Sequence, residues 1–436
     1  MPRPTGLVTP QGGAGGVTVA RAVEMVTDGT MALRITAFDG SATGPVDAVV
    51  GLHLRSRRGL RYLLTAPGEL GLARAYISGE LELIGAHPGD PYPVLAELAA
   101  GLAFHRPPTA DLVRILRGIG WQSLMPIPPP PQEVAPRWRR LAAGLSHSRA
   151  RDAAAVGHHY DVSARFYRNV LGPSMVYTCA AYPSVDSSLE VAQENKMRLV
   201  FEKLRLRPGD RLLDLGCGWG PFVLYAARRG VRAVGVTLAA EQARFGQRAI
   251  AEAGLDDLAE IRHGDYRDHT ETGFDAVSSM GMTEHIGIAQ YPTYFAIMHA
   301  ALRPGGLMLN HCVTRRDGHA RTRAGATADR YIWPDGQLAS VGRIVSAIHD
   351  AGFEVLHTEN LREHYALTLA HWSANLVEHW DDAVAEIGAE RARIWGLFMA
   401  AGRLRMRRGR LQLHQVLATK PDHAAHPVPL GPWWQR

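Results

Sequence analysis

A glycine-rich segment at residues 214–220 combines residue types that can bind a small cofactor. It has the sequence Asp-Leu-Gly-Cys-Gly-Trp-Gly and follows a short apolar run. Glycines permit a tight turn and let the backbone approach a ligand closely, where side chains would block it. A dinucleotide-binding turn spaces its first glycines by two and then three residues, whereas the spacing here is two and two. This version favours the methionine part of S-adenosylmethionine, which carries no pyrophosphate.

Polar and aromatic side chains further along the chain could contact the rest of this ligand. Thr237 and Gln242 lie at a predicted strand-to-helix junction, where the ribose would lie. Thr237 could equally serve only as a helix N-cap. Tyr266 ends the segment Gly264-Asp-Tyr, which follows the second predicted strand and its helix, and it could offer an aromatic face to adenine or only pack.

Alternating strands and helices after residue 190 must position these residues. The predicted helices are 193–204, 221–229 and 241–253, and the predicted strands are 211–215, 231–236, 274–279 and 306–310. Such alternation implies a parallel sheet with helices on both faces and a ligand at the carboxyl ends of the strands. The predicted fold class is therefore α/β: a class I methyltransferase with a Rossmann-like, doubly wound sheet, preceded by a small α+β N-terminal domain.

Composition shifts divide the chain into five predicted parts. These are a disordered tail (1–16), an N-terminal domain (17–125), a proline-rich linker with a basic helix (126–150), the methyltransferase domain (151–420) and a C-terminal tail (421–436). Within the N-terminal domain, segments 48–54 and 60–64 alternate in the manner of strands, whereas 68–77 and 92–103 indicate helices. That domain has no chemical motif, so we expect it to dock on lipid or to mediate oligomer contacts.

The overall composition bounds the possible partners and the compartment. The chain has 436 residues, a formal net charge of +6 and three cysteines, too few for a disulfide framework. It has no apolar run long enough to cross a bilayer and no leader-like N-terminus. We therefore expect a cytoplasmic protein. The positive charge favours nucleic acid or an anionic membrane, unless the arginines are only solvated, and no aromatic and basic stacking platform for nucleic acid is found.

Three further motifs together carry a resemblance to a known family. They are Tyr177-Thr-Cys179, the sequence Gly-Met-Thr-Glu-His at 281–285, and His311-Cys-Val313. With these motifs the chain resembles the cyclopropane-fatty-acid synthase family, which includes the mycolic-acid and 10-methylene fatty-acid methyltransferases of actinobacteria. The resemblance extends from His159 to Val416, and residues 67–76 also look like that family's N-terminal domain.

The resemblance implies an S-adenosylmethionine-dependent C-methyltransferase acting on the double bond of unsaturated, oleoyl-type phospholipid acyl chains. A bicarbonate ion beside the cofactor would deprotonate the resulting carbocation. The implied catalytic residues are Cys179, Glu284, His311, Val313 and Tyr365. The predicted cofactor-binding residues are Tyr177, Thr178, Asp214, Gly216, Cys217, Gly218, Trp219, Gly220, Thr237, Leu238, Gln242, Asp265, Tyr266 and Arg267. We expect no metal ion.

Several of these residues also have purely structural interpretations. Cys179 could be a small buried hydrophobic residue, His311 a core histidine with its bonds satisfied, and Tyr365 a packing residue. Thr283 stands where the family usually has an aromatic residue, so we expect it to enlarge or reshape the acyl pocket.

Overall similarity favours a 10-methylene product, with a cyclopropane as the alternative. A 10-methylene product implies a separate reductase partner. The other expected partners are an anionic membrane on its inner face, where association would be peripheral, and a second copy of the chain. Two other classes stay open, namely a methyltransferase for small molecules or nucleic acid and a lipid-binding protein with an inactive site.

Overall fold

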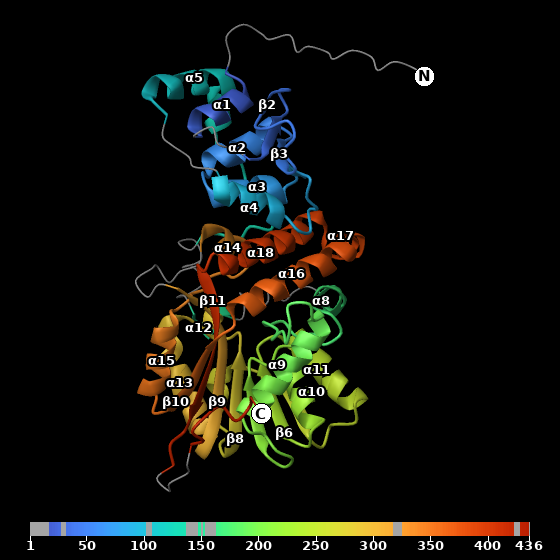
Figure 1. Cartoon of the computed structure of the whole chain (residues 1–436), viewed down its shortest axis with the longest axis vertical. Coiled ribbons are helices and arrows are strands. Elements are labelled where there is room, and N and C mark those ends of the chain that lie inside the picture. The colour runs from blue at the N-terminus through green and yellow to red at the C-terminus, as the bar shows by residue number, and fades with distance from the viewer. Residues whose placement is uncertain are drawn as a thin grey trace. The chain divides into compact units, whose positions relative to one another are not determined.

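The computed structural model describes residues 17–27, 32–101, 107–136, 147–149, 151–152, 163–316, 325–422 and 428–435. The chain forms two compact units, one of residues 1–133 with 388–397 and one of residues 134–387 with 398–436 (Figure 1). The predicted disordered tail, most of the predicted basic helix and the motif beginning at His159 lie outside the described residues. No helix among the described residues is long and apolar enough to cross a membrane.

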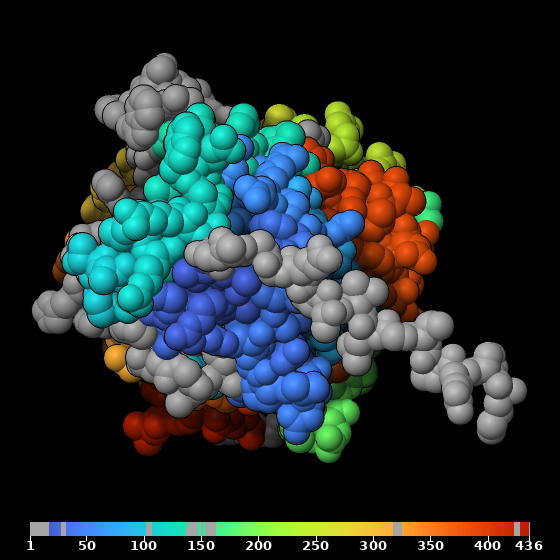
Figure 2. All heavy atoms as spheres, turned by 90° about the horizontal axis from the view of Figure 1, so that it is seen from above, coloured from blue at the N-terminus to red at the C-terminus, as the bar shows by residue number. Residues whose placement is uncertain are grey.

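The first unit is a small α+β domain, as predicted. Its sheet has the order β2-β1-β3-β4, in which β1 and β3 are parallel and the outer pairs are antiparallel. The strands are β1 (Arg34–Ala37), β2 (Ala42–Thr43), β3 (Gly51–Leu54) and β4 (Leu81–Ile84). The helices are α1 (Val19–Val26), α2 (Arg57–Thr65), α3 (Glu69–Ile77), α4 (Tyr92–Gly101), α5 (Thr109–Ile119) and η1 (Trp121–Leu124). Helix α5, in cyan, lies beside α1, in blue, and shares the core with it (Figure 2).

One sequence prediction for this unit needs correction. Residues 60–64 belong to helix α2 and not to a strand. The Ser56 hydroxyl caps this helix by accepting from the backbone N–H groups of Arg58 and Gly59. The predicted proline-rich linker is attached to the unit, because its Pro128 carbonyl accepts a hydrogen bond from the Tyr62 hydroxyl at 3.0 Å. The helices predicted at 68–77 and 92–103 correspond to α3 and α4.

The second unit contains a seven-stranded sheet of order β10-β11-β9-β8-β5-β6-β7. Its strands are β5 (Arg211–Leu215), β6 (Arg232–Thr237), β7 (Ala259–His263), β8 (Phe274–Met280), β9 (Leu302–Arg315), β10 (Glu354–Asn360) and β11 (Leu411–Thr419). The pairs from β9 to β7 are parallel. The four predicted strands correspond to β5, β6, β8 and β9, which are parallel as predicted. Strand β11, which was not predicted, is antiparallel to both β9 and β10, so the sheet as a whole is mixed.

Helices cover both faces of this sheet, as expected for a doubly wound fold (Figure 1). The helices of this unit are α8 (Ala164–Leu171), α9 (Leu189–Lys203), α10 (Pro221–Ala227), α11 (Ala240–Glu252), η3 (Tyr266–Asp268), α12 (Thr283–Ile286), η4 (Ile288–Gln290), α13 (Tyr291–Ala301), α14 (Ala326–Tyr331), α15 (Val341–Asp350), α16 (Arg362–Glu378) and α17 (Trp380–Ile387). Helix α18 (Ala389–Arg407) belongs partly to each unit, because residues 388–397 group with the first. In β5, Leu212 packs into the core formed with α9 and α10, whereas Leu213 and Leu215 pack into the core formed with α13. Strand β5 is therefore fixed from both faces.

Candidate active site

The predicted glycine turn directly follows strand β5. Gly216, Gly218 and Gly220 all have positive φ, at 76°, 56° and 83°. A Cβ on Gly216 would lie 2.2 Å from Cγ of Met282, whereas a Cβ on Gly218 would have no atom within 4 Å. Gly218 faces a cavity, so a side chain there would enter that space.

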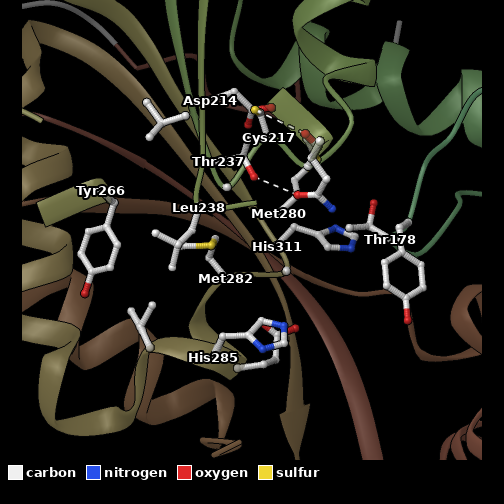
Figure 3. A pocket seen from close by; sticks show the side chains of 18 of the residues that line it. Thr178, Asp214, Cys217, Thr237, Leu238, Tyr266, Met280, Met282, His285 and His311 are labelled. Carbon is white, nitrogen blue, oxygen red and sulfur yellow. Dashed lines mark hydrogen bonds between the residues drawn. The ribbon is translucent and has the colours of Figure 1, made fainter. Parts of the chain in front are cut away.

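The cavity lies where the carboxyl ends of β5, β6 and β8 meet (Figure 3). It is lined by every predicted cofactor-binding residue except Gly220. Gly220 has a packing role instead, because a Cβ there would lie 2.3 Å from Cδ1 of Ile261 on β7. The Thr237 hydroxyl donates to Oε1 of Gln242 at 2.8 Å, so the two predicted ribose-binding residues are paired across the strand-to-helix junction.

Two observations test whether the lining fits S-adenosylmethionine. The backbone at Gly218 leaves room for a ligand where any other residue would place a side chain. The buried Nε1 of Trp219 and the buried hydroxyl of Tyr266 have no hydrogen-bond partner among the described residues. Buried polar groups are normally paired, and a bound ligand can supply partners. The residues present therefore fit a polar, aromatic ligand of this kind.

A buried pair of opposite charges forms one wall of the cavity. Asp214 accepts a hydrogen bond from the Ser278 hydroxyl at 2.6 Å, and burial raises the pKa of Asp214 to about 6. Burial also lowers the pKa of Lys196, on α9, to about 8, an effect that Asp214 opposes. Lys196 was not predicted as a site residue, because a lysine in a helical pattern ordinarily faces solvent.

All five predicted catalytic residues line the same cavity although they come from distant parts of the chain. Cys179 precedes α9, Glu284 is on α12, His311 and Val313 are on β9, and Tyr365 is in the first turn of α16. The wall near them also includes Met175, Met282, Trp333, Pro334 and Leu413. Side chains that can accept or donate a proton thus line a cavity whose wall is largely apolar.

Glu284 is buried and holds a fixed orientation. Its Oε1 accepts from the backbone N–H of Val313 at 2.7 Å, and its Oε2 accepts from the Thr283 hydroxyl at 3.3 Å. Burial raises the pKa of Glu284 to about 7, although these two hydrogen bonds oppose the rise. Thr283 is not among the lining residues, so the structure does not support its predicted effect on the acyl pocket.

His311 is a neutral imidazole with one nitrogen left for a ligand. Burial lowers the pKa of His311 well below its usual value, and the ammonium groups of Lys196 and Lys203 lower it further. Nδ1 of His311 lies 3.2 Å from Nε2 of Gln415. Nε2 of His311 is buried and has no partner among the described residues, so the interpretation as a satisfied core histidine does not hold.

Cys179 provides structure and not a reactive thiolate. Its thiol donates to the carbonyl oxygen of Ala180 at 3.1 Å, and burial raises the pKa of this thiol. The ring of Tyr365 packs edge-on against Trp372 with ring centroids 6.1 Å apart, while Tyr365 also lines the cavity. Cys179 and Tyr365 therefore both contact neighbouring protein groups and line the cavity.

The raised pKa of Glu284 predicts a pH-dependent cost to stability. In the folded chain the carboxyl binds its proton more tightly than the ordinary value of 4.5 would give. Its contribution to stability is thus fully present below pH 4.5 and is lost as the pH rises through about 7. Glu284→Gln, which cannot ionise, should therefore gain roughly 1–3 kcal/mol relative to the parent at high pH.

Thermal unfolding of both proteins at about pH 5 and about pH 8 measures this difference. The melting temperature of Glu284→Gln should exceed that of the parent mainly at the higher pH. An equal difference at both values would show that Glu284 ionises in its folded environment as it does in water.

The fold and the site together define a class of enzyme. The strand order, the glycine turn after β5 and the cavity at the carboxyl ends of the strands are those of a class I S-adenosylmethionine-dependent methyltransferase. The family model for mycolic acid cyclopropane synthetase matches residues 147–416. The chain belongs to this family.

Relatives and solved structures agree with that assignment. A probable fatty acid methyltransferase of Mycobacterium tuberculosis is 58% identical over 423 residues, covering 97% of this chain and 99% of the relative. A probable fatty acid methyltransferase of Pseudomonas putida is 41% identical over 286 residues, covering 64% of this chain and 73% of the relative. The mycolic acid cyclopropane synthase CmaA1, solved with SAH and CTAB, has a TM-score of 0.58 and 30% identity, covering 62% of this chain and 98% of that one.

Proposed function

We propose that this enzyme transfers the methyl carbon of S-adenosylmethionine to the double bond of an oleoyl-type phospholipid acyl chain and forms a 10-methylene branch. One observation carries the proposal: a neutral His311 with a free Nε2 and a protonatable Glu284 share an apolar cavity with the predicted cofactor-binding residues. This combination suits alkene methylation, because that reaction passes through a cation that must lose a proton to a nearby base without meeting water. The naming of two relatives as probable fatty acid methyltransferases supports an acyl substrate.

The chemistry begins at the sulfonium of S-adenosylmethionine, which supplies an electrophilic methyl group. The alkene π electrons form the new carbon–carbon bond as the carbon–sulfur bond breaks, and the neighbouring alkene carbon becomes a cation. A hydride then shifts from the methylated carbon to the cationic carbon. Loss of a proton from the added methyl group finally gives the exomethylene branch, so the chain gains one methylene unit overall.

The protein's own groups position a base for that last proton. A bicarbonate ion fits the residues present, since a buried anion requires donors and Nε2 of His311 is a buried nitrogen without a partner among the described residues. Tyr365 lines the same cavity. Glu284, with a pKa of about 7, can hold or pass on a proton near neutral pH. The apolar wall limits the access of water to the cation.

The substrate and product suggest the proposed partners. A phospholipid substrate requires peripheral association with an anionic membrane at its cytoplasmic face. Arg55, Arg57 and Arg58 of the first unit are exposed. Arg55 and Arg58 lie beside Glu82 and Glu80, so Arg57 is the one of the three for which the structure shows no ion pair among the described residues, and a basic residue near such a surface contributes about 1 kcal/mol. A methylene branch is an alkene, so a separate reductase would convert it to a methyl branch. A second copy of the chain is also proposed as a partner.

Mass spectrometry of acyl chains tests the proposed reaction. The purified protein is incubated with S-adenosylmethionine and oleoyl-phospholipid liposomes, and the same mixture without S-adenosylmethionine is the control. We expect the oleoyl chains to gain the mass of one methylene unit, and fragmentation should locate an exomethylene group. A ring in its place would assign the cyclopropane reaction. No mass gain with S-adenosylmethionine still bound would contradict the proposed substrate.

A further inference from the structure

Four buried or half-buried polar side chains form a continuous chain that ends at the active-site histidine. Nζ of Lys203 lies 2.5 Å from Oε2 of Glu359 and 2.7 Å from Oε1 of Gln415. Nε2 of Gln415 in turn lies 3.2 Å from Nδ1 of His311. Lys203, Gln415 and His311 are each at most 1% exposed. The four residues come from α9, β10, β11 and β9, so only the folded sheet brings them together.

The lysine determines which way the glutamine amide faces. The Lys203 ammonium group only donates hydrogen bonds, so the group of Gln415 that meets it must be the carbonyl oxygen. The amide nitrogen therefore faces His311. Rotating the amide by half a turn would set two donors against each other at the lysine, and that orientation is excluded for as long as Lys203 stays in place.

The orientation of the amide in turn determines the tautomer of the histidine. An amide NH₂ group only donates, so Nδ1 of His311 must accept through its lone pair. In a neutral imidazole the single hydrogen then sits on Nε2. This nitrogen is the one that has no partner among the described residues, and His311 lines the cavity beside Thr178 and Met280 (Figure 3).

We propose that Gln415 and Lys203 are positioning residues that hold His311 in its Nε2–H tautomer, so that His311 donates a hydrogen bond into the cavity. The identity of the acceptor as the reacting base rests on the proposed function. The tautomer itself does not depend on the proposed function. With the other tautomer, Nε2 would present a lone pair and repel an anion.

The surroundings of His311 keep its imidazole ring neutral. The ammonium groups of Lys196 and Lys203, both on α9, disfavour a positive charge on the ring. The other titratable groups lining the cavity are Arg151, Asp152, Tyr177, Cys179, Asp214, Cys217, Asp265, Tyr266, Arg267, Glu284, His285, Asp335 and Tyr365. Burial is the largest cause that lowers the pKa of His311 well below its usual value, so the neutral ring is favoured.

Nitrogen NMR of the parent protein tests the tautomer directly and needs no substrate. The protein is labelled with ¹⁵N at its histidines, and the His311 signals are assigned by their loss in His311→Asn. We expect a protonated Nε2 and an unprotonated Nδ1 across the neutral pH range. A hydrogen on Nδ1 would overturn the proposal whether or not the enzyme methylates lipid.

Gln415→Glu should reverse the tautomer with almost no change of shape. One carboxylate oxygen can stay with Lys203, while the other replaces the amide nitrogen and accepts from Nδ1–H. Turnover near neutral pH should fall roughly 10- to 100-fold, the range found when a functional histidine loses its outer hydrogen-bond partner. The KM for S-adenosylmethionine should stay unchanged, because Gln415 does not line the cavity.

The pH profile of this variant separates positioning from structural damage. A carboxylate beside Nδ1 raises the pKa of the histidine, so lowering the pH should produce an imidazolium that again carries Nε2–H. Relative to the parent, Gln415→Glu should therefore recover turnover as the pH falls. Gln412→Glu, the same change in strand β11 at a half-buried position outside the cavity, is the matched control. Full activity of Gln415→Glu at neutral pH, or a uniform loss at every pH, would contradict the proposal.

Discussion

Glu284→Gln should lower turnover by roughly 10²- to 10⁴-fold, the usual contribution of a proton-transfer group. Glutamine has nearly the same shape, and its carbonyl oxygen can still accept from the backbone N–H of Val313. The variant loses only the ability to take up and release a proton. Glu284 can do both near neutral pH because its pKa is about 7. Binding of S-adenosylmethionine should stay nearly intact. Single-turnover rates on oleoyl liposomes and calorimetric titration measure the two quantities.

Glu354→Gln is the matched control for this variant. Glu354 begins strand β10, is exposed and does not line the cavity. The same loss of charge there should leave both turnover and binding unchanged. An unimpaired rate in Glu284→Gln would remove Glu284 from the mechanism, and a parallel loss of S-adenosylmethionine affinity would reduce its role to that of shaping the pocket.

Gly218→Val should abolish binding of S-adenosylmethionine while the protein stays folded. Gly218 lines the cavity, and a Cβ there meets no protein atom within 4 Å. The valine side chain would therefore occupy space that the ligand needs. The positive φ of 56° adds backbone strain of about 1–2 kcal/mol for a residue with a Cβ. Calorimetric titration should show no heat of binding, and thermal unfolding should show only a modest fall in melting temperature.

Gly254→Val distinguishes lost space from backbone strain. Gly254 follows helix α11, is exposed and has a φ of 64°, and a Cβ there would likewise meet no atom within 4 Å. This variant should lose similar stability and keep its affinity. Retained affinity in Gly218→Val would mean that the ligand lies elsewhere, and lost affinity in both variants would attribute the effect to strain.

Local patterns in the sequence predicted the elements whose structure is decided locally. The turn at Gly216 and Gly218 needs positive φ, and this requirement is visible as glycine spacing. The central strands are continuous apolar runs because both faces of β5 are buried. The five implied catalytic residues came from motif resemblance, and the structure brings all of them to one cavity.

The features that the sequence did not reveal depend on contacts between distant segments. The apolar pattern of residues 60–64 is so short that it is compatible with both a strand and a helix. The N-cap from Ser56 helps to make this segment part of helix α2. The antiparallel direction of β11 depends on its pairing with β9 and β10. No local pattern links Lys203 to Gln415, which are separated by more than two hundred positions, so their contact with His311 appears only in the folded sheet.

The position of β11 also has a consequence for the order in which the enzyme matures. Strand β11 lies between β9 and β10 in the sheet, yet the ribosome makes it after both of them. Until β11 emerges, β9 and β10 have no strand between them, and His311 lacks the Gln415 that holds its ring. A nascent chain can therefore assemble the glycine turn long before it completes the catalytic wall.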